Sequence, residues 1–181
     1  MKVLILGAAG QIGYLLTQDL LEQTNYELIL YARNASQRLK EMESKRVSLV
    51  NGDFTDFDTL VKAMKKVDAI YLNDMNDKAG VQTIAKAMRA TKNKRIIAVS
   101  ILGIYDEVPG AFGDWNRKMV GSQGIQNHKE TVSFIEIPQL DYTILRLTWL
   151  YNQDGNRNYH LTYKGESFEG AQVTREAVSQ I

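Results

Sequence analysis

Short apolar runs alternate with segments of helical periodicity over the first 150 residues. Runs of this length are typical of strands that are buried on both faces. They cover residues 2–6, 27–32, 47–50, 68–72, 95–100 and 142–147. The alternation predicts an α/β fold, a doubly wound parallel sheet with helices on both faces. Right-handed crossovers favour the Rossmann-type strand order 3-2-1-4-5-6.

The segments between these runs carry apolar residues three and four positions apart. Three such faces are Ile12, Leu15, Leu16 and Leu20; Phe57, Leu60, Val61 and Met64; and Val81, Ile84, Ala85 and Met88. Thr55 and Asp58 have the spacing of a capping box at the start of the second of these helices. A short polar helix is expected over residues 36–43, and a further helix over about 127–136, before Pro138.

The remaining segments carry weaker patterns. Residues 101–124 are rich in glycine, contain Pro109 and are predicted to form a loop. Beyond Tyr151 the chain turns polar, with short strand-like pieces such as residues 159–163. We therefore expect a single domain, with a core over residues 1–150 and a small C-terminal segment over residues 151–181.

A glycine-rich turn follows the first apolar run directly. Gly7, Gly10 and Gly13 are spaced as Gly-x-x-Gly-x-x-Gly, between a strand pattern and a helix pattern. In this context Gly7 permits a tight turn, Gly10 lets the backbone approach a pyrophosphate, and Gly13 lets the helix pack on the strand. The N–H groups and the positive end of the helix dipole then face the anion. The pattern predicts dinucleotide binding, with an ordinary turn as the alternative.

Composition excludes several other classes of protein. The chain has 181 residues, a net charge of +1 and no cysteine. It therefore offers no disulfide, no thiolate nucleophile and no thiolate zinc site, and its charge gives no reason to expect nucleic acid or a membrane surface as a partner. His128 and His160 lie too far apart in sequence for a local metal motif. No apolar run reaches the ~18 residues of a membrane span, so a cytoplasmic location is expected.

Several segments besides the glycine turn carry a family resemblance. They are residues 33–34, residues 52–53, the strand that ends at Ser100, residues 141–146 and residues 173–178. On these segments the chain resembles the atypical short-chain dehydrogenase/reductase superfamily, in its NmrA-like, NAD(P)H-binding branch, over nearly its whole length. Residues 173–178 resemble the family's late strand entering its terminal helix. The chain stops where that helix begins, as a truncated family member would.

The resemblance implies a cofactor site along the carboxyl ends of the strands. The expected contacts from the glycine turn are Gly7, Ala9, Gly10, Gln11, Ile12 and Gly13. Asp53 would reach the adenine amino group, with the Phe54 backbone beside it; otherwise Asp53 is a turn or capping residue. Asn73 would touch the ribose-phosphate side, and Ser100 would also contact the cofactor.

The residues after the second strand favour NADP(H) over NAD(H). An NAD-selective site presents a carboxylate to the ribose 2′-hydroxyl, whereas a 2′-phosphate needs a cation and hydrogen-bond donors. This position offers Arg33 and Asn34, with no acidic residue between Tyr31 and Lys40. The flat fork of arginine matches phosphate oxygens. The alternative is a surface arginine at the end of a strand.

The catalytic candidates are Ser100, Tyr105 and Lys129. Short-chain dehydrogenases usually use a Ser with a Tyr-x-x-x-Lys pair, in which the tyrosine is the general acid. Lys129 lies on the expected helix, but Ile125 occupies the position four residues earlier. Ser100 is followed by Ile101 where the family commonly has paired serines. Tyr105 is the nearest replacement hydroxyl, or else an ordinary loop tyrosine.

Two functions from different classes remain. Hydride transfer to a quinone, a flavin or a similar planar acceptor needs no side-chain acid, so NADPH-dependent reduction of such an acceptor is the first hypothesis. Candidate pocket walls, which could equally be core residues, are Tyr105, Phe112, Trp115 and Trp149. His128 could donate to an acceptor oxygen, although a surface histidine at a helix start is the simpler interpretation.

The second hypothesis is an NADP(H)-binding redox sensor that does not turn the cofactor over and docks on a partner protein, for example through residues 103–124. An epimerase-like enzyme acting on nucleotide sugars is the weakest alternative, because it would need the missing tyrosine.

Overall fold

The computed structural model describes residues 1–181 and contains a six-stranded parallel sheet in the order β3-β2-β1-β4-β5-β6. The strands are β1 (Lys2–Leu6), β2 (Glu27–Ala32), β3 (Val47–Asn51), β4 (Ala69–Leu72), β5 (Arg95–Ile101) and β6 (Asp141–Leu147). The neighbouring strands β1, β2 and β4 bury nearly all their side chains, because helices cover both faces of the sheet. The predicted fold class and strand order are confirmed.

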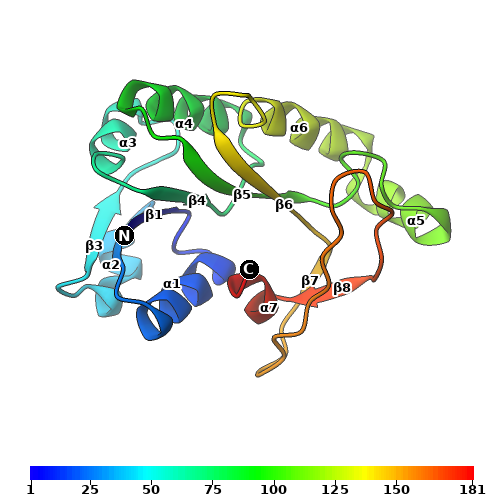
Figure 1. The fold of residues 1–181 in the computed structure, drawn as a ribbon, viewed down its shortest axis with the longest axis horizontal. Coiled ribbons are helices and arrows are strands. Elements are labelled where there is room, and N and C mark those ends of the chain that lie inside the picture. The colour runs from blue at the N-terminus through cyan, green and yellow to red at the C-terminus, as the bar shows by residue number, and fades with distance from the viewer.

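Helices form one layer on each face of the sheet (Figure 1). The layer with α3 (Phe57–Ala63), α4 (Lys78–Thr91) and α6 (Ser122–Ser133) packs on one face, around the larger cluster of buried apolar side chains. The layer with α1 (Gln11–Gln23), α2 (Ala35–Arg38) and α7 (Arg175–Ser179) covers the other face. None of these helices combines the length and the apolar character that crossing a lipid bilayer requires.

Three predicted segments between strands were wrong in extent. The polar helix expected over residues 36–43 is only α2, followed by a 3₁₀ turn (Lys40–Met42), because buried Leu39 leaves the helical conformation between them. The loop predicted over residues 101–124 contains α5 (Gly110–Val120), and α6 begins at Ser122 rather than near residue 127. Glycines concealed both helices. Gly113 is required by packing, since a Cβ there would lie 2.1 Å from the carbonyl oxygen of Val108.

Two local predictions at α3 were also wrong. The helix is capped by Asp56, whose side chain accepts a hydrogen bond of 3.0 Å from the N–H of Thr59, and not by a Thr55–Asp58 capping box. Phe57 was expected in the core but is 41% exposed. The cap explains the exposure, because Asp56 at the N-cap makes Phe57 the first residue of the helix, at the edge of the packed layer.

The strand-like piece expected over residues 159–163 is irregular. The C-terminal segment forms a different parallel pair, β7 (Trp149–Tyr151) with β8 (Gln172–Thr174), which opens directly into α7. The Thr174 side chain caps α7 by accepting a hydrogen bond from the N–H of Ala177, at 3.0 Å.

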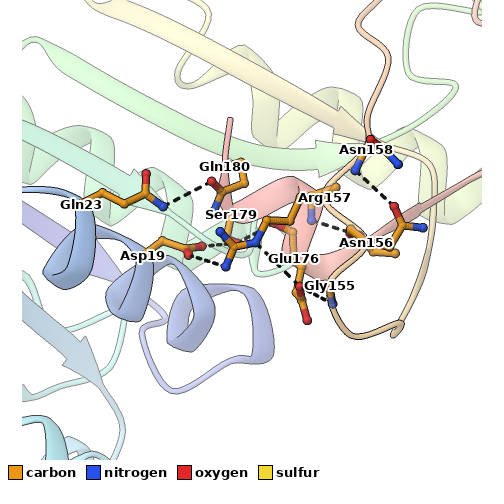
Figure 2. A network of polar contacts seen from close by, with 11 residues as sticks. Asp19, Gln23, Gly155, Asn156, Arg157, Asn158, Glu176, Ser179 and Gln180 are labelled. Atoms are coloured by element: carbon orange, nitrogen blue, oxygen red, sulfur yellow. Dashed lines mark hydrogen bonds and ion pairs between the residues drawn. The ribbon is translucent and has the colours of Figure 1, made fainter.

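Buried Asp19 of α1 holds the C-terminal segment to the core (Figure 2). Its carboxylate accepts a hydrogen bond of 2.6 Å from Ser179 and lies 3.4 Å from the guanidinium of Arg157. Glu176 accepts a hydrogen bond of 3.0 Å from the N–H of Gly155, and Gln23 donates to Gln180 at 3.3 Å. The contacts of Asp19 and Gln23 join residues that are more than 130 positions apart in the chain.

Candidate functional site

The glycine turn forms a tight backbone cradle between β1 and α1. Gly7 has a φ of +82°, which side chains disfavour, and its N–H donates to the carbonyl oxygen of Tyr31 at 2.9 Å. A Cβ on Gly13 would lie 2.7 Å from the Gly7 oxygen, and a Cβ on Gly10 would lie 2.7 Å from the Asn73 amide. The first turn of α1 has no side-chain cap and no acidic residue, so its N–H groups are left for a ligand.

A cavity of about 340 Å³ lies beside this cradle, at the carboxyl ends of the first four strands. Of the residues predicted to bind the cofactor, it is lined by Gly7, Ala9, Gly10, Arg33, Asp53, Phe54 and Asn73. Gln11 lines an adjoining cavity of about 440 Å³, which also includes Ala9 and Gly10. Ile12, Gly13, Asn34 and Ser100 line neither cavity, and Ile12 and Gly13 are buried behind the cradle.

Two exposed arginines stand at the β2 end of the cavity, Arg33 and Arg38. Neither lies within 4.0 Å of a carboxylate, whereas Arg38 donates to the carbonyl oxygen of Ala9 at 3.0 Å. Arg38 was not predicted. Its signal in the sequence was a second arginine five residues after Arg33. The single turn of α2 brings this second arginine to the same cavity. Asn34 adopts a left-handed conformation as the N-cap of α2, and this turn in the backbone separates the two arginines.

Asp53 is held in a fixed turn at the end of β3. Its carboxylate accepts hydrogen bonds from the N–H and the hydroxyl of Thr55, at 3.0 and 2.8 Å. The bond from the Thr55 backbone is the main reason that the pKa of Asp53 is lowered, and Arg33 lowers it further. Tyr31 supports the same turn from below by donating to the Asp53 carbonyl oxygen at 2.7 Å. Asp53 therefore presents an ionised acceptor at the cavity.

Asn73 supplies an unsatisfied group in the lining. Its Oδ1 atom is buried and has no hydrogen-bond partner, although the side chain stands at the cavity between Gly10 and Asp74. A buried acceptor without a partner is costly unless a ligand or water supplies a donor. A dinucleotide fits this lining, since its ribose hydroxyls can donate to Asn73 and its phosphates can accept from the helix N–H groups and the arginines.

The three catalytic candidates have three different partners. Ser100, at the end of β5, is 2% exposed and lies 3.4 Å from the Nδ1 atom of His128. Lys129 is 3.5 Å from Asp106 on the surface. Tyr105 donates to Glu136 at 2.9 Å, and burial, followed by that bond, raises its pKa. The structure thus does not assemble a serine–tyrosine–lysine group.

His128 is not the surface residue at a helix start that the sequence suggested. Because α6 begins at Ser122, His128 lies in its second turn and is partly buried against β5. Burial lowers the pKa of the imidazole, while the carboxylate of Asp74 acts in the opposite direction.

Three of the four candidate wall residues come together with Phe168. Phe112 stacks on Trp115 at 5.6 Å and on Phe168 at 6.1 Å, between ring centroids, and Trp115 lies 4.8 Å from Trp149. Trp115 is 43% exposed, so part of this aromatic cluster faces solvent. Tyr105 is not part of the cluster, because its ring lies under the cations of Arg146 and Lys164.

A buried ion pair, which the sequence did not reveal, fixes the segment after β5. Arg146 of β6 lies 3.0 Å from Glu107, with side chains 9% and 4% exposed. Glu107 also accepts hydrogen bonds from the N–H groups of Gly103 and Tyr105, and its carbonyl oxygen accepts from Phe168. The Arg146–Glu107 contact is an ion pair without an aligned hydrogen bond, since Nη1 of Arg146 has no partner of suitable geometry.

The fold and the cradle define a class, the dinucleotide-binding α/β proteins with a glycine-rich turn at the first strand. A family model described as NAD(P)H-binding matches residues 7–181. The chain belongs to this NAD(P)H-binding family. Comparison with the curated proteins gave no match.

Similar solved structures belong to the same group of proteins. A short-chain dehydrogenase/reductase from Veillonella parvula, solved in complex with NADP, is 33% identical, with a TM-score of 0.93 over 99% of this chain and 83% of that one. A Rossmann-fold NAD(P)-binding family protein from Shigella flexneri is 28% identical, with a TM-score of 0.78 over 99% and 82%. ChuY, an anaerobillin reductase from Escherichia coli O157:H7, is 18% identical and similar in fold alone, with a TM-score of 0.76 over 99% and 87%. The predicted membership in the atypical short-chain dehydrogenase/reductase family is confirmed.

Proposed function

We propose that this protein binds NADP(H) and uses it to reduce a quinone, a flavin or a similar planar acceptor. The observation that carries the cofactor assignment is the pair of arginines, Arg33 and Arg38, that stand free of carboxylates at the β2 end of the cavity. The absence of an acidic residue directly after β2 supports it, because a carboxylate there would repel a 2′-phosphate. The Veillonella parvula relative with bound NADP is consistent with this assignment.

The aromatic cluster supports a planar acceptor. Stacking on exposed aromatic rings such as Trp115 favours flat, conjugated molecules. Ile125 stands where the family's general acid would be, and Tyr105 and Lys129 are paired with Glu136 and Asp106. This pattern disfavours alcohol–ketone chemistry and leaves acceptors that take a hydride directly, for which the protein's task is to bind and orient both partners.

The cofactor assignment is tested by titrating the protein with NADPH and NADH. A charge-assisted hydrogen bond contributes about 1.5–3 kcal/mol, so Arg33→Ala or Arg38→Ala should raise the Kd for NADPH about 10- to 100-fold and leave that for NADH nearly unchanged. Arg89→Ala is the matched control, since Arg89 is exposed at the end of α4 and away from the cavity. Equal affinities of the wild type for the two cofactors would refute the assignment to NADP(H).

Turnover is tested by following the loss of reduced-nicotinamide absorbance with a panel of quinones and with free flavin. The proposal expects oxidation of NADPH with at least one acceptor, and a slower rate at sub-saturating NADPH for Arg33→Ala. Tight NADPH binding without turnover would instead favour the second candidate, a redox sensor. The specific observation for that candidate is that Tyr105 and Lys129 both have carboxylate partners in the structure.

A further inference from the structure

Ser100 and His128 form a buried polar pair at the carboxyl edge of the sheet. In the register of β4 and β5, Leu72 pairs with Ala98. Ser100 lies two residues beyond Ala98 on β5, and Asp74, two residues beyond Leu72, lines the cavity. Ser100 is 2% exposed, and its hydroxyl lies 3.4 Å from the Nδ1 atom of His128 on α6. This places a hydroxyl and an imidazole beside the edge where a hydride donor and its acceptor would meet.

The charges around His128 come from four parts of the chain. Asp74, on the segment after β4, acts directly on the imidazole. Lys129, the next residue of α6, is paired with Asp106 of the segment after β5, and Glu130 is paired with Lys78 of α4. Asn127 donates to the carbonyl oxygen of Asn76 at 2.8 Å and so holds α6 against the segment that carries Asp74. Of these titratable groups, His128 is in no ion pair, and Asp74 acts on it only through its charge.

Tyr105, the other candidate acid, is poorly suited to give up a proton. Its hydroxyl already donates to Glu136, and burial raises its pKa. The imidazolium form of His128 is a far stronger acid, since its burial lowers the pKa from the ordinary value of 6.5. Near neutral pH the imidazolium of His128 therefore gives up a proton more readily than the hydroxyl of Tyr105 does.

We propose that His128 supplies, through the hydroxyl of Ser100, the proton that the acceptor takes up when it is reduced. The inference rests on the proposed function. A two-electron reduction consumes one hydride, which NADPH supplies, and one proton. Imidazolium Nδ1–H donates to the oxygen of Ser100, whose own proton passes to the acceptor oxygen. The products are NADP⁺, the protonated reduced acceptor and neutral His128, which solvent reprotonates. In this route the Ser100 hydroxyl hands the proton to the acceptor, and His128 acts through it.

The first experiment is a pH profile of kcat with saturating NADPH and a quinone that the wild type reduces. The wild-type kcat should fall roughly tenfold per pH unit above the pKa of His128, because only the imidazolium can donate. His128→Gln should lower kcat at pH 6 by about 10²-fold and flatten the profile. His160→Gln is the matched control, since the only other histidine is largely exposed on the C-terminal segment.

The second experiment reads the pair without catalysis. The two histidine ring signals are followed by NMR against pH and assigned with His160→Gln. Ser100→Ala should lower the pKa of His128, because the imidazolium loses the oxygen to which it donates, while the pKa of His160 stays constant. The Kd for NADPH should change less than twofold in His128→Gln, which separates a proton route from a binding role.

The outcomes distinguish the inference from the function on which it rests. A wild type that binds NADPH and reduces no acceptor overturns the proposed function and this proton route with it. A wild type that reduces an acceptor, together with a His128→Gln variant of unchanged kcat and pH profile, overturns the proton route alone. An unchanged pKa of His128 in Ser100→Ala also overturns it.

Discussion

The half of the chain up to α4 and the half from β5 onward place their functional groups in different ways. In the first half, the residues around the cofactor cavity follow directly on strands β1 to β4, so the parallel sheet itself brings Gly10, Arg33, Asp53 and Asn73 together. In the second half, the candidate groups lie on β5, the segment after it, α5, α6 and β7, and long-range polar contacts decide where most of them stand.

The two halves differ in the interactions that position their functional groups. A strand end needs only the correct register, which the apolar pattern and the crossovers determine. The C-terminal segment buries few apolar side chains. Specific polar pairs fix it and the segment after β5: Glu107 with Arg146, Asp19 with Ser179, and Trp149 with Asn116 at 3.0 Å. We therefore expect the second half to be sensitive to single polar substitutions, and the first half to be sensitive to added volume.

The largest effect is expected for Glu107→Gln. Removing one member of a buried ion pair leaves the other charge uncompensated, which costs about 3–5 kcal/mol in the free energy of unfolding. Asp106→Asn is the control. The Asp106 carboxylate, next to Glu107 in the chain, is exposed, and its ion pair with Lys129 should contribute less than about 1 kcal/mol. Urea denaturation measures both. A loss for Glu107→Gln no larger than that for Asp106→Asn would contradict the role given to the buried pair.

A smaller effect on stability is expected for Gly13→Ala, in the first half. The added Cβ would lie 2.7 Å from the Gly7 oxygen and 2.9 Å from the Ala8 Cα, both of them backbone atoms that cannot move without opening the cradle. Overpacking of this kind costs about 1–3 kcal/mol. NADPH binding should weaken at least tenfold as well.

Gly124→Ala provides the contrast to Gly13→Ala. A Cβ at this position of α6 meets only a methyl group of Val120, at 3.2 Å, and a helical alanine is preferred over glycine by roughly 0.5–1 kcal/mol. This variant should therefore keep its affinity for NADPH. Normal NADPH binding by Gly13→Ala would show that the cradle does not hold the cofactor.

The smallest effect is expected for Asp19→Asn, at the junction of the two halves (Figure 2). The change removes the charge opposite Arg157 and weakens the bond from Ser179, which together should cost about 1–2 kcal/mol. Hydrogen exchange should rise in residues 152–181 and remain unchanged in β1 to β4. Glu22→Gln, an exposed residue of the same helix, is the control. Uniform protection in both variants would mean that apolar packing alone holds the segment.

The sequence by itself determined the sheet, its strand order and most residues that line the cavity beside the glycine turn. The hydrophobic periodicity that marks strands and helices is a local property of the sequence. The carboxyl ends of parallel strands then meet at one edge of the sheet, however the rest of the chain folds. Arg38 was missed because its place in the cavity lining depends on the single turn of α2, and this turn is too short to leave a periodic pattern in the sequence. The helix over Gly110–Val120 was missed because its glycines are also typical of loops, although one of them, Gly113, is required by the backbone of Val108.

Only the tertiary structure decided the partners of the candidate catalytic groups. Ser100 and Lys129 lie at positions that the resemblance marks, and Tyr105 was only the nearest replacement hydroxyl. In the structure each of them contacts a residue from a different part of the chain. His128 changed from a surface residue to a partly buried one because α6 starts five residues earlier than its apolar pattern indicated. A pattern along the chain specifies which face of a helix is buried, whereas contacts between side chains depend on how the helices and the C-terminal segment pack on the sheet, and that packing involves residues from the whole chain.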